Sequence, residues 1–311
     1  MNWVLGFDTS CYTTSVAILD LEGGLLADSR RMLTVRQGGR GLAQSEMVFQ
    51  HTRNMPAVLE EALAKVAGAP AAIGVTDCPR PLPDSYMPAF LVGAGFAKAL
   101  ALSHRVPLLT LSHQENHILA GVWSAGGPYA ERFLAVHVSG GTSEILLAQR
   151  LQGQRLALKL LGGTIDLHAG QFVDRVGVAL GLPFPAGRHL EALARTATGS
   201  VRLPVAVTRL DASFSGPASQ ALRLISAGGE PAEIAYAVET CIAETVARLI
   251  HAAVAETGTT DVLLAGGVMA NQHIRVYLEE RLAAVCRLFW PQAAYSPDNA
   301  VGAAFYSLLV R

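Results

Sequence analysis

Two histidines four residues apart could bind one metal ion. In the stretch SHQENH at residues 112–117, Ser112 is followed three residues later by Glu115, which is the capping-box pattern of a helix start. A helix beginning there puts His113 and His117 on one face, within reach of a single ion. Glu115 lies roughly 200° around the helix from His113, so it suits capping better than the base of an H-E-x-x-H metalloprotease. Two ordinary surface histidines remain the alternative.

Three glycine-rich or polar turns could hold a nucleotide or complete a metal site. The turn VSGGTS at residues 138–143 lets backbone approach a phosphate closely, although a plain hairpin turn explains it equally. The stretch LLAGGVMAN at residues 263–271 is a strand, paired glycines and a helix start, which can hold adenosine phosphates but lacks Rossmann or P-loop spacing. In SPDNA at residues 296–300, the ordinary role of Asp298 is a helix N-cap.

The elements that would position these residues include a repeated hairpin. Residues 5–19 and 133–148 each show an apolar strand, a small polar turn and a second apolar strand, with Thr-Ser beginning the return. Two such hairpins indicate a duplicated architecture with one hairpin per lobe, although any two β-hairpins with polar turns look alike.

Helical and strand patterns alternate along the rest of the chain, which predicts an α/β protein with covered sheets. A proline-rich segment at residues 78–84 can be neither a helix nor a central strand, so it predicts an extended loop. Helices are predicted at 45–67, 90–102, from His113, and at 169–180, 232–257 and 271–285, with strands at 107–111 and 261–265.

Composition limits the classes of function. The chain has 311 residues, of which 51% are hydrophobic, so two lobes with large cores can form. The net charge of −1 gives no support for broad electrostatic capture of nucleic acid such as tRNA. The N-terminus predicts a strand instead of a signal peptide, and the apolar run at 88–102 is too short to span a bilayer, so we expect a cytoplasmic protein without a membrane partner.

The four cysteines are widely spaced and form no C-x-x-C pair. This spacing is typical of buried reduced thiols and not of zinc ligands or disulfides. The cysteines are Cys11, Cys78, Cys241 and Cys286.

Taken together and in order, these segments resemble the catalytic subunit family of tRNA threonylcarbamoyladenosine synthase, long called an O-sialoglycoprotein endopeptidase. The resemblance covers nearly the whole chain. It rests on these segments: GFDTSC at 6–11, H-x-x-x-H at 113–117, VSGG at 138–141, residues 161–187, SFSG at 213–216, AGGV-x-AN at 265–271 and the tripeptide Asp-Asn-Ala at 298–300. It implies the two-lobed actin-like fold of sugar kinases and heat-shock ATPases. It also implies an N-terminal lobe at 1–125 completed by the helix at 296–311, and a C-terminal lobe at 126–295.

The resemblance also implies site residues. The family's metal ligands fall on His113, His117 and Asp298, a donor set suited to one divalent iron or zinc ion. The ligand would be ATP, AMP or threonylcarbamoyl-adenylate. The implied phosphate or carbamoyl-adenylate segment is His137, Val138, Ser139, Gly140 and Gly141. Asp174 would bind ribose hydroxyls, Gly187 would let backbone approach the nucleotide, and Asn271 would contact the adenosine.

Several positions depart from the family pattern. Tyr12 and Thr13 replace an acidic pair, and a bulky segment at 78–88 replaces a small glycine-proline loop. Differences also occur in DLHAGQ at 166–171 and at Pro217-Ala218. These changes indicate a divergent paralogue.

The function expected from the resemblance is transfer of threonylcarbamoyl from its adenylate to an acceptor amine, with tRNA adenosine as the family's acceptor. The alternative is a non-catalytic nucleotide-binding scaffold of the same fold, which the lost acidic pair favours. An endopeptidase lacks a water-activating base near the metal, and a kinase would have no use for the histidine pair. Family members work with a smaller same-fold subunit and an ATPase, so a homodimer or heterodimer is expected.

Overall fold

The computed structural model describes residues 2–35, 42–151 and 155–310, and the chain divides into two compact units. Unit 1 comprises Met1–Gly127, Arg150–Leu156 and Ala294–Arg311, and unit 2 comprises Pro128–Gln149 and Ala157–Ala293. The segment Arg150–Leu156 therefore falls in unit 1, although it lies within the range expected for the second lobe.

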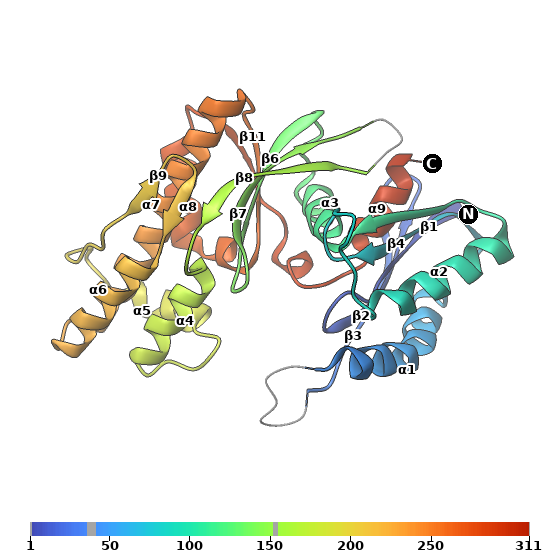
Figure 1. Cartoon of the computed structure of the whole chain (residues 1–311), viewed down its shortest axis with the longest axis horizontal. Helices are drawn as coiled ribbons and strands as arrows, with labels where there is room; N and C mark the ends of the chain where they lie inside the picture. The colour runs from blue at the N-terminus through green and yellow to red at the C-terminus, as the bar shows by residue number, and fades with distance from the viewer. Residues whose placement is uncertain (1, 36–41, 152–154, 311) are drawn as a thin grey trace. The chain divides into compact units, whose positions relative to one another are not determined.

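Unit 1 is built on a sheet that, among the described residues, has five strands in the order β3-β2-β1-β4-β5 (Figure 1). Strands β3, β2 and β1 are antiparallel neighbours, whereas β4 runs parallel to both β1 and β5. The strands are β1 (Asn2–Asp8), β2 (Thr13–Asp20), β3 (Leu25–Met32), β4 (Ala69–Cys78) and β5 (Leu108–Ser112).

Helices cover this sheet because its strands β1, β2 and β4 are buried along nearly their whole length. Buried residues of α1 and α2 join those of β1, β2 and β4 in one hydrophobic core. Helix α9 packs against β1 and β4, and α3 packs against α9. The helices are α1 (Gln44–Leu63), α2 (Phe90–His104), α3 (His113–Ala125) and α9 (Val301–Val310).

Two glycines bring α9 into direct contact with the sheet. A Cβ atom at Gly6 would lie 2.3 Å from the carbonyl oxygen of Ala300, and one at Gly74 would lie 2.1 Å from that of Ala303. No side chain fits at such distances, so only glycine permits this packing. The segment that precedes α9, including Asp298, is thereby fixed near the end of β1.

Unit 2 repeats the strand plan of unit 1. Its sheet, within the described residues, has the order β12-β11-β6-β7-β8-β10-β9. The part β8-β7-β6-β11-β12 matches β3-β2-β1-β4-β5, with three antiparallel neighbours followed by parallel strands. This confirms the duplicated architecture that the two hairpins predict. The strands are β6 (Arg132–Val138), β7 (Ser143–Gln149), β8 (Ala157–Thr164), β9 (Ala206–Thr208), β10 (Asp211–Ser213), β11 (Asp261–Ala265) and β12 (Arg287–Phe289).

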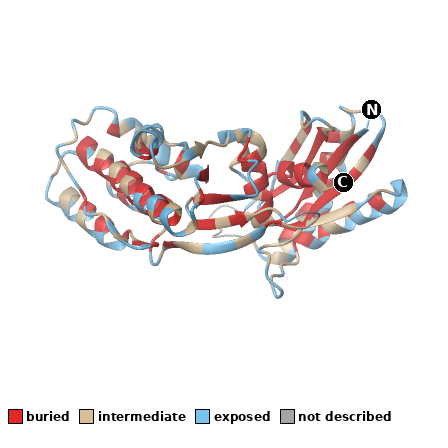
Figure 2. Ribbon diagram, turned by 90° about the horizontal axis from the view of Figure 1, so that it is seen from above, coloured by how far each residue is buried: buried red, intermediate tan, exposed pale blue. Residues whose placement is uncertain are grey.

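The core of unit 2 is organised around α7, most of which is buried. Figure 2 shows that buried residues run along the strands and along one face of many helices. Its helices are α4 (Ala169–Ala179), α5 (Gly187–Ala194), α6 (Ser215–Ser226), α7 (Pro231–Thr257) and α8 (Gln272–Leu282), with the 3₁₀ turns η1 (Gly267–Ala270) and, at the unit boundary, η2 (Ala293–Tyr295).

The helices and strands that the sequence predicts are present, but several elements, including β3, β4, β8, α5 and α6, were not predicted. The first helix ends at Leu63, and the chain then forms β4, a strand that the sequence analysis did not predict. Strand β4 contains alanine and glycine and is buried without alternation, so neither propensity nor period reveals it. A further difference is that the paired glycines lead into the 3₁₀ turn η1, and α8 begins only at Gln272. No helix among the described residues is long and apolar enough to cross a membrane.

Candidate metal centre and nucleotide pocket

Helix α3 starts where the sequence predicts because Ser112 and Glu115 cap it reciprocally. The Glu115 backbone N–H donates to Ser112 Oγ at 3.2 Å, and the Ser112 backbone N–H donates to Glu115 Oε2 at 2.7 Å. Glu115 is fully buried in this role. Its carboxylate therefore serves the helix start, as its position in the sequence indicates.

His113, His117 and Asp298 come together in unit 1. The Nε2 atoms of the two histidines are 3.0 Å apart, and Asp298 Oδ1 lies 3.5 Å from His113 Nε2 and 3.4 Å from His117 Nε2. Asp298 does not cap α9, because the Val301 N–H donates to Asn299 Oδ1 instead. The carboxylate of Asp298 is thus left to face the two imidazoles.

A second carboxylate lies behind His113. Asp8, at the end of β1, is fully buried, and its Oδ1 is 3.6 Å from His113 Nδ1. Burial by itself lowers the pKa of His113, but the negative charges of the nearby Asp8 and Asp298 carboxylates help to raise it well above its usual value. Burial likewise raises the pKa of Asp298, and the two histidines outweigh that effect and lower it. The site therefore stabilises positive charge.

The donor atoms fit a divalent transition-metal ion. Two donors bound at about 2.1 Å and roughly 90–110° apart are separated by about 3.0–3.4 Å, which is close to the measured edges of this triangle. Asp8 lies on the side of His113 where a carboxylate commonly supports a metal-binding histidine, but at 3.6 Å it is too far for a hydrogen bond to the buried Nδ1. Two nitrogens and one oxygen leave coordination positions open, as catalytic sites require.

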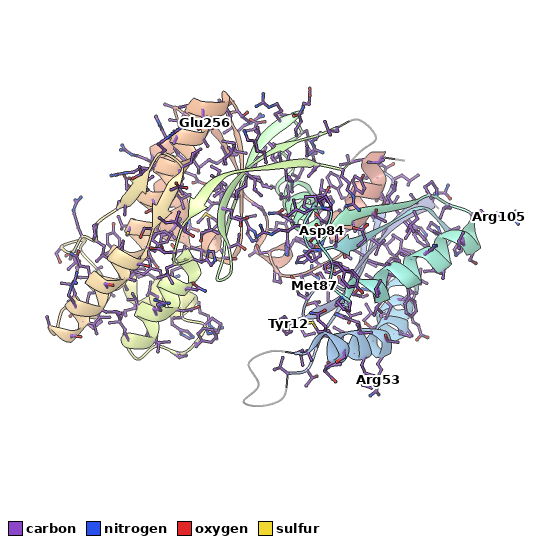
Figure 3. The ribbon with its side chains drawn as sticks, in the orientation of Figure 1. Tyr12, Arg53, Asp84, Met87, Arg105 and Glu256 are labelled. Atoms are coloured by element: carbon purple, nitrogen blue, oxygen red, sulfur yellow. The ribbon has the colours of Figure 1, made fainter. Side chains whose placement is uncertain are left out.

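Cys11 also belongs to this cluster, although the wide spacing of the cysteines is typical of ordinary buried thiols. One ligand atom each of Cys11, His113 and Asp298 lies within 4.8 Å of the others. Cys11 lies in the turn between β1 and β2, directly before Tyr12, which Figure 3 labels at the edge of unit 1. The sequence gives no local signal for this placement, because the partners of Cys11 are distant along the chain.

Unit 2 contains a pocket of about 780 Å³, a volume in the range of small-molecule sites. It opens between α4, α5, α7 and the η1–α8 junction. Its lining residues are Gly140, Gly170, Val173, Asp174, Phe184, Pro185, Gly187, Arg188, Leu190, Glu191, Glu239, Gly267, Val268, Ala270, Asn271 and Ile274.

The pocket brings together four of the residues expected to bind nucleotide. Gly140, Asp174, Gly187 and Asn271 all line it. Asp174 Oδ1 accepts a hydrogen bond from the Ala186 N–H at 2.8 Å, so its other oxygen is the one available to a ligand. The remaining expected residues, His137, Val138, Ser139 and Gly141, are not among the lining residues.

The glycine-rich turn at residues 138–141 packs against the start of α4. The Gly170 N–H donates to the Ser139 carbonyl at 3.1 Å, and a Cβ atom at Gly170 would lie 2.6 Å from the Gly140 nitrogen. The Ala169 N–H donates to Ser143 Oγ at 2.9 Å. Two amides in the first turn of α4 are therefore already bonded within the protein, and Gly140 is the member of the turn that reaches the pocket.

Two acidic residues of the pocket escaped the sequence analysis. Glu239 on α7 is buried and accepts a hydrogen bond from Asn271 Nδ2 at 2.7 Å. Burial raises its pKa to about 7, with nearby Glu191 adding to the rise and the Asn271 bond opposing it. A single acid in a long helix is unremarkable in a sequence, so only the fold shows that Glu239 faces a pocket.

Two solved structures with the same architecture are distant from this chain in sequence. Component A of the (R)-2-hydroxyglutaryl-CoA dehydratase of Acidaminococcus fermentans has a TM-score of 0.57 at 18% identity, covering 99% of this chain and 98% of its own. A glucokinase of the ROK family from Streptomyces griseus has a TM-score of 0.54 at 11% identity, covering 98% and 99%. These likenesses show that the fold is the actin-like ATPase and sugar-kinase fold, as expected.

Sequence comparison is more specific. The family model of tRNA N6-adenosine threonylcarbamoyltransferase matches residues 30–305. A tRNA N6-adenosine threonylcarbamoyltransferase of Aromatoleum aromaticum (strain DSM 19018 / LMG 30748 / EbN1) is 34% identical over 320 residues, covering 98% of this chain and 90% of that protein. Because both matches extend over most of its length, the chain belongs to the tRNA N6-adenosine threonylcarbamoyltransferase family.

Proposed function

We propose that this protein transfers a threonylcarbamoyl group from its adenylate to the N6 amine of adenosine in tRNA. Membership of the family supports this reaction class, and the relative from Aromatoleum aromaticum bears the name of this activity. The observation that carries the proposal is the triangle formed by His113, His117 and Asp298, whose donor atoms are 3.0–3.5 Å apart.

We assign an iron or zinc ion to this triangle. Imidazole nitrogen and carboxylate oxygen suit either metal, and a bound ion would supply Lewis-acid polarisation of a carbonyl oxygen. The protein's own contribution is to hold the ligands. Asp8 places a negative charge behind His113, and the contact of α9 with the sheet holds the segment that carries Asp298.

We assign the nucleotide to the pocket of unit 2. Asp174 offers a carboxylate oxygen for ribose hydroxyls, and Gly187 has no heavy atom within 4 Å of a Cβ position, so a ligand can approach its backbone closely. Asn271 is held in one orientation because its Oδ1 accepts from the Ile274 N–H and its Nδ2 donates to Glu239. An oriented amide of this kind suits recognition of an adenosine.

The geometry of Glu115 bears against an endopeptidase. Such an enzyme needs a base to activate a metal-bound water. Here Glu115 Oε2 accepts hydrogen bonds from both the backbone N–H and the hydroxyl of Ser112. Its carboxylate is thus engaged in capping.

The experiment combines elemental analysis, calorimetry with AMP, and transfer to a tRNA transcript followed by nucleoside mass spectrometry. We expect near-stoichiometric iron or zinc, AMP binding, and modified adenosine that disappears in His113→Ala. Protein that binds metal and AMP but forms no modified adenosine, when threonylcarbamoyl-adenylate and the partner subunits expected from the family are supplied, would contradict the transfer reaction. Protein with neither ligand would contradict both site assignments and support a scaffold.

A further inference from the structure

Cys11 lies among the residues assigned to the metal ion, and nothing in the family resemblance gives it a role there. Its Sγ, one ring nitrogen of His113 and one carboxylate oxygen of Asp298 lie within 4.8 Å of one another. The two other members of this group are already the assigned ligands. Cys11 thus lies beside candidate metal ligands, whereas the buried Cys241 donates its S–H to the carbonyl of Pro204.

The turn that carries Cys11 is held in place by contacts with distant segments. The Cys11 carbonyl oxygen is 3.1 Å from His51 Nε2, and the other ring nitrogen of His51 is 2.8 Å from Thr14 Oγ1. His51 is fully buried, so this contact is shielded from water. On the far side of the turn, the Leu33 N–H donates to the Tyr12 carbonyl at 2.8 Å.

Asp298 is connected to the same turn through the backbone. The backbone N–H of Tyr12 donates a hydrogen bond to the Asp298 carboxylate. This contact is independent of the Cys11 side chain, yet it brings the turn against the carboxylate that faces the two histidines. The position of Cys11 beside the cluster is therefore fixed from both sides, by His51 and by Asp298.

We propose that Cys11 is a further ligand of the metal ion bound by His113, His117 and Asp298. This inference rests on the metal centre proposed above. A Cys-His-His-Asp donor set selects borderline and soft divalent ions, zinc and ferrous iron, over magnesium and calcium, because the thiolate is a soft donor. With four protein ligands, a carbonyl oxygen would bind as a fifth ligand, a coordination number that zinc and iron both reach. Binding displaces the thiol proton to solvent, so metal uptake releases a proton that a set without the thiol would not release.

The test uses cobalt(II) as a spectroscopic probe of the purified protein after removal of its native metal. Thiolate bound to cobalt(II) gives an intense near-ultraviolet charge-transfer band that nitrogen and oxygen ligands do not give. We expect this band in the wild type and in Cys286→Ser, a half-exposed cysteine of unit 2 that serves as the matched control. Cys11→Ser should bind cobalt without the band. Its affinity for cobalt should fall by about 10–100-fold, the loss typical when a residue that supports a metal site is removed.

A second measurement needs no variant. Alkylation of each cysteine by iodoacetamide is followed by peptide mass spectrometry with and without zinc. Zinc should slow modification of Cys11 by at least about tenfold, in line with the loss of free thiolate, and leave Cys286 unchanged. Cobalt bound without the band, together with alkylation of Cys11 that ignores zinc, would overturn the proposal and leave the His-His-Asp site standing. Absence of metal binding in every form would instead refute the metal centre itself.

Discussion

The Nε2 atoms of His113 and His117 lie 3.0 Å apart, with Asp298 Oδ1 within 3.5 Å of both. The two nitrogens are close because one turn of α3 separates them on the same helix face. Asp298 is far from the histidines in the sequence. Its carboxylate lies beside them because α9, which follows it, packs against β1, β4 and α3. The site therefore combines a local motif, the histidine pair of α3, with a long-range contact, the packing of α9 on the sheet.

Replacing His113 by alanine should abolish stoichiometric metal binding while the protein stays folded. The imidazole is a donor at the centre of the site, in reach of His117, Asp298 and Cys11 alike, so its removal takes away the ligand that links the others and tight binding is lost. Elemental analysis after dialysis measures the loss, and circular dichroism checks the fold. His104→Ala is a suitable control, because His104 lies in the last turn of α2 and outside the cluster. The site assignment would be refuted if the wild type contained no metal and the His113→Ala variant failed to fold.

Replacing Glu115 by alanine should lower the free energy of unfolding by about 1–3 kcal/mol, because a buried carboxylate and both of its Ser112 contacts are lost. Glu115→Gln keeps an acceptor oxygen for the capping box and should cost less. Metal content should be unchanged in both, as elemental analysis beside chemical denaturation would show. Loss of activity in Glu115→Gln with stability and metal intact would mean that Glu115 acts in the chemistry.

The sequence predicted the parts of the site that depend on local structure. Capping by Ser112 and the i,i+4 spacing of the histidines were readable because they involve neighbours along one helix. The part played by Asp298 came only through family resemblance, since by itself an aspartate before a helix is an N-cap.

Cys11 and Glu239 could not be found in this way. Cys11 meets His113 only because β1, β5 and α9 belong to one unit, and Glu239 faces the pocket only because α7 and α8 pack together. Neither residue has a pattern in its own neighbourhood that distinguishes it from a buried thiol or a helical acid. Strand β4 was missed for a related reason, since a fully buried parallel strand shows no alternation.

Replacing Gly74 by alanine should destabilise the protein by about 3 kcal/mol, because the new Cβ would lie 2.1 Å from the carbonyl oxygen of Ala303 in α9. The contact is with backbone, so no side chain can rotate away. Gly95→Ala is the matched control, since Gly95 lies in α2 with nothing within 4 Å of its Cβ position. That change should stabilise by up to about 1 kcal/mol through helix propensity. Equal unfolding midpoints for the two variants would contradict close packing of α9 on the sheet.

Replacing Glu239 by glutamine should change how stability depends on pH. Burial raises the pKa of Glu239 from 4.5 to about 7 in the folded protein. The folded state therefore holds this proton more tightly than the unfolded chain, and the associated stability is complete below about pH 4.5 and lost as pH rises to about 7. The loss amounts to roughly 1–3 kcal/mol.

Glu239→Gln has no such proton, and its amide oxygen can still accept from Asn271 Nδ2. The difference in free energy of unfolding between variant and wild type should thus grow in favour of the variant between pH 4.5 and 7 and level off above. Denaturant titrations at several pH values measure this difference. AMP affinity should fall with rising pH in the wild type more than in the variant, because an ionised Glu239 in the pocket repels phosphate. A difference in stability that stays constant across this range would show that Glu239 keeps its ordinary pKa.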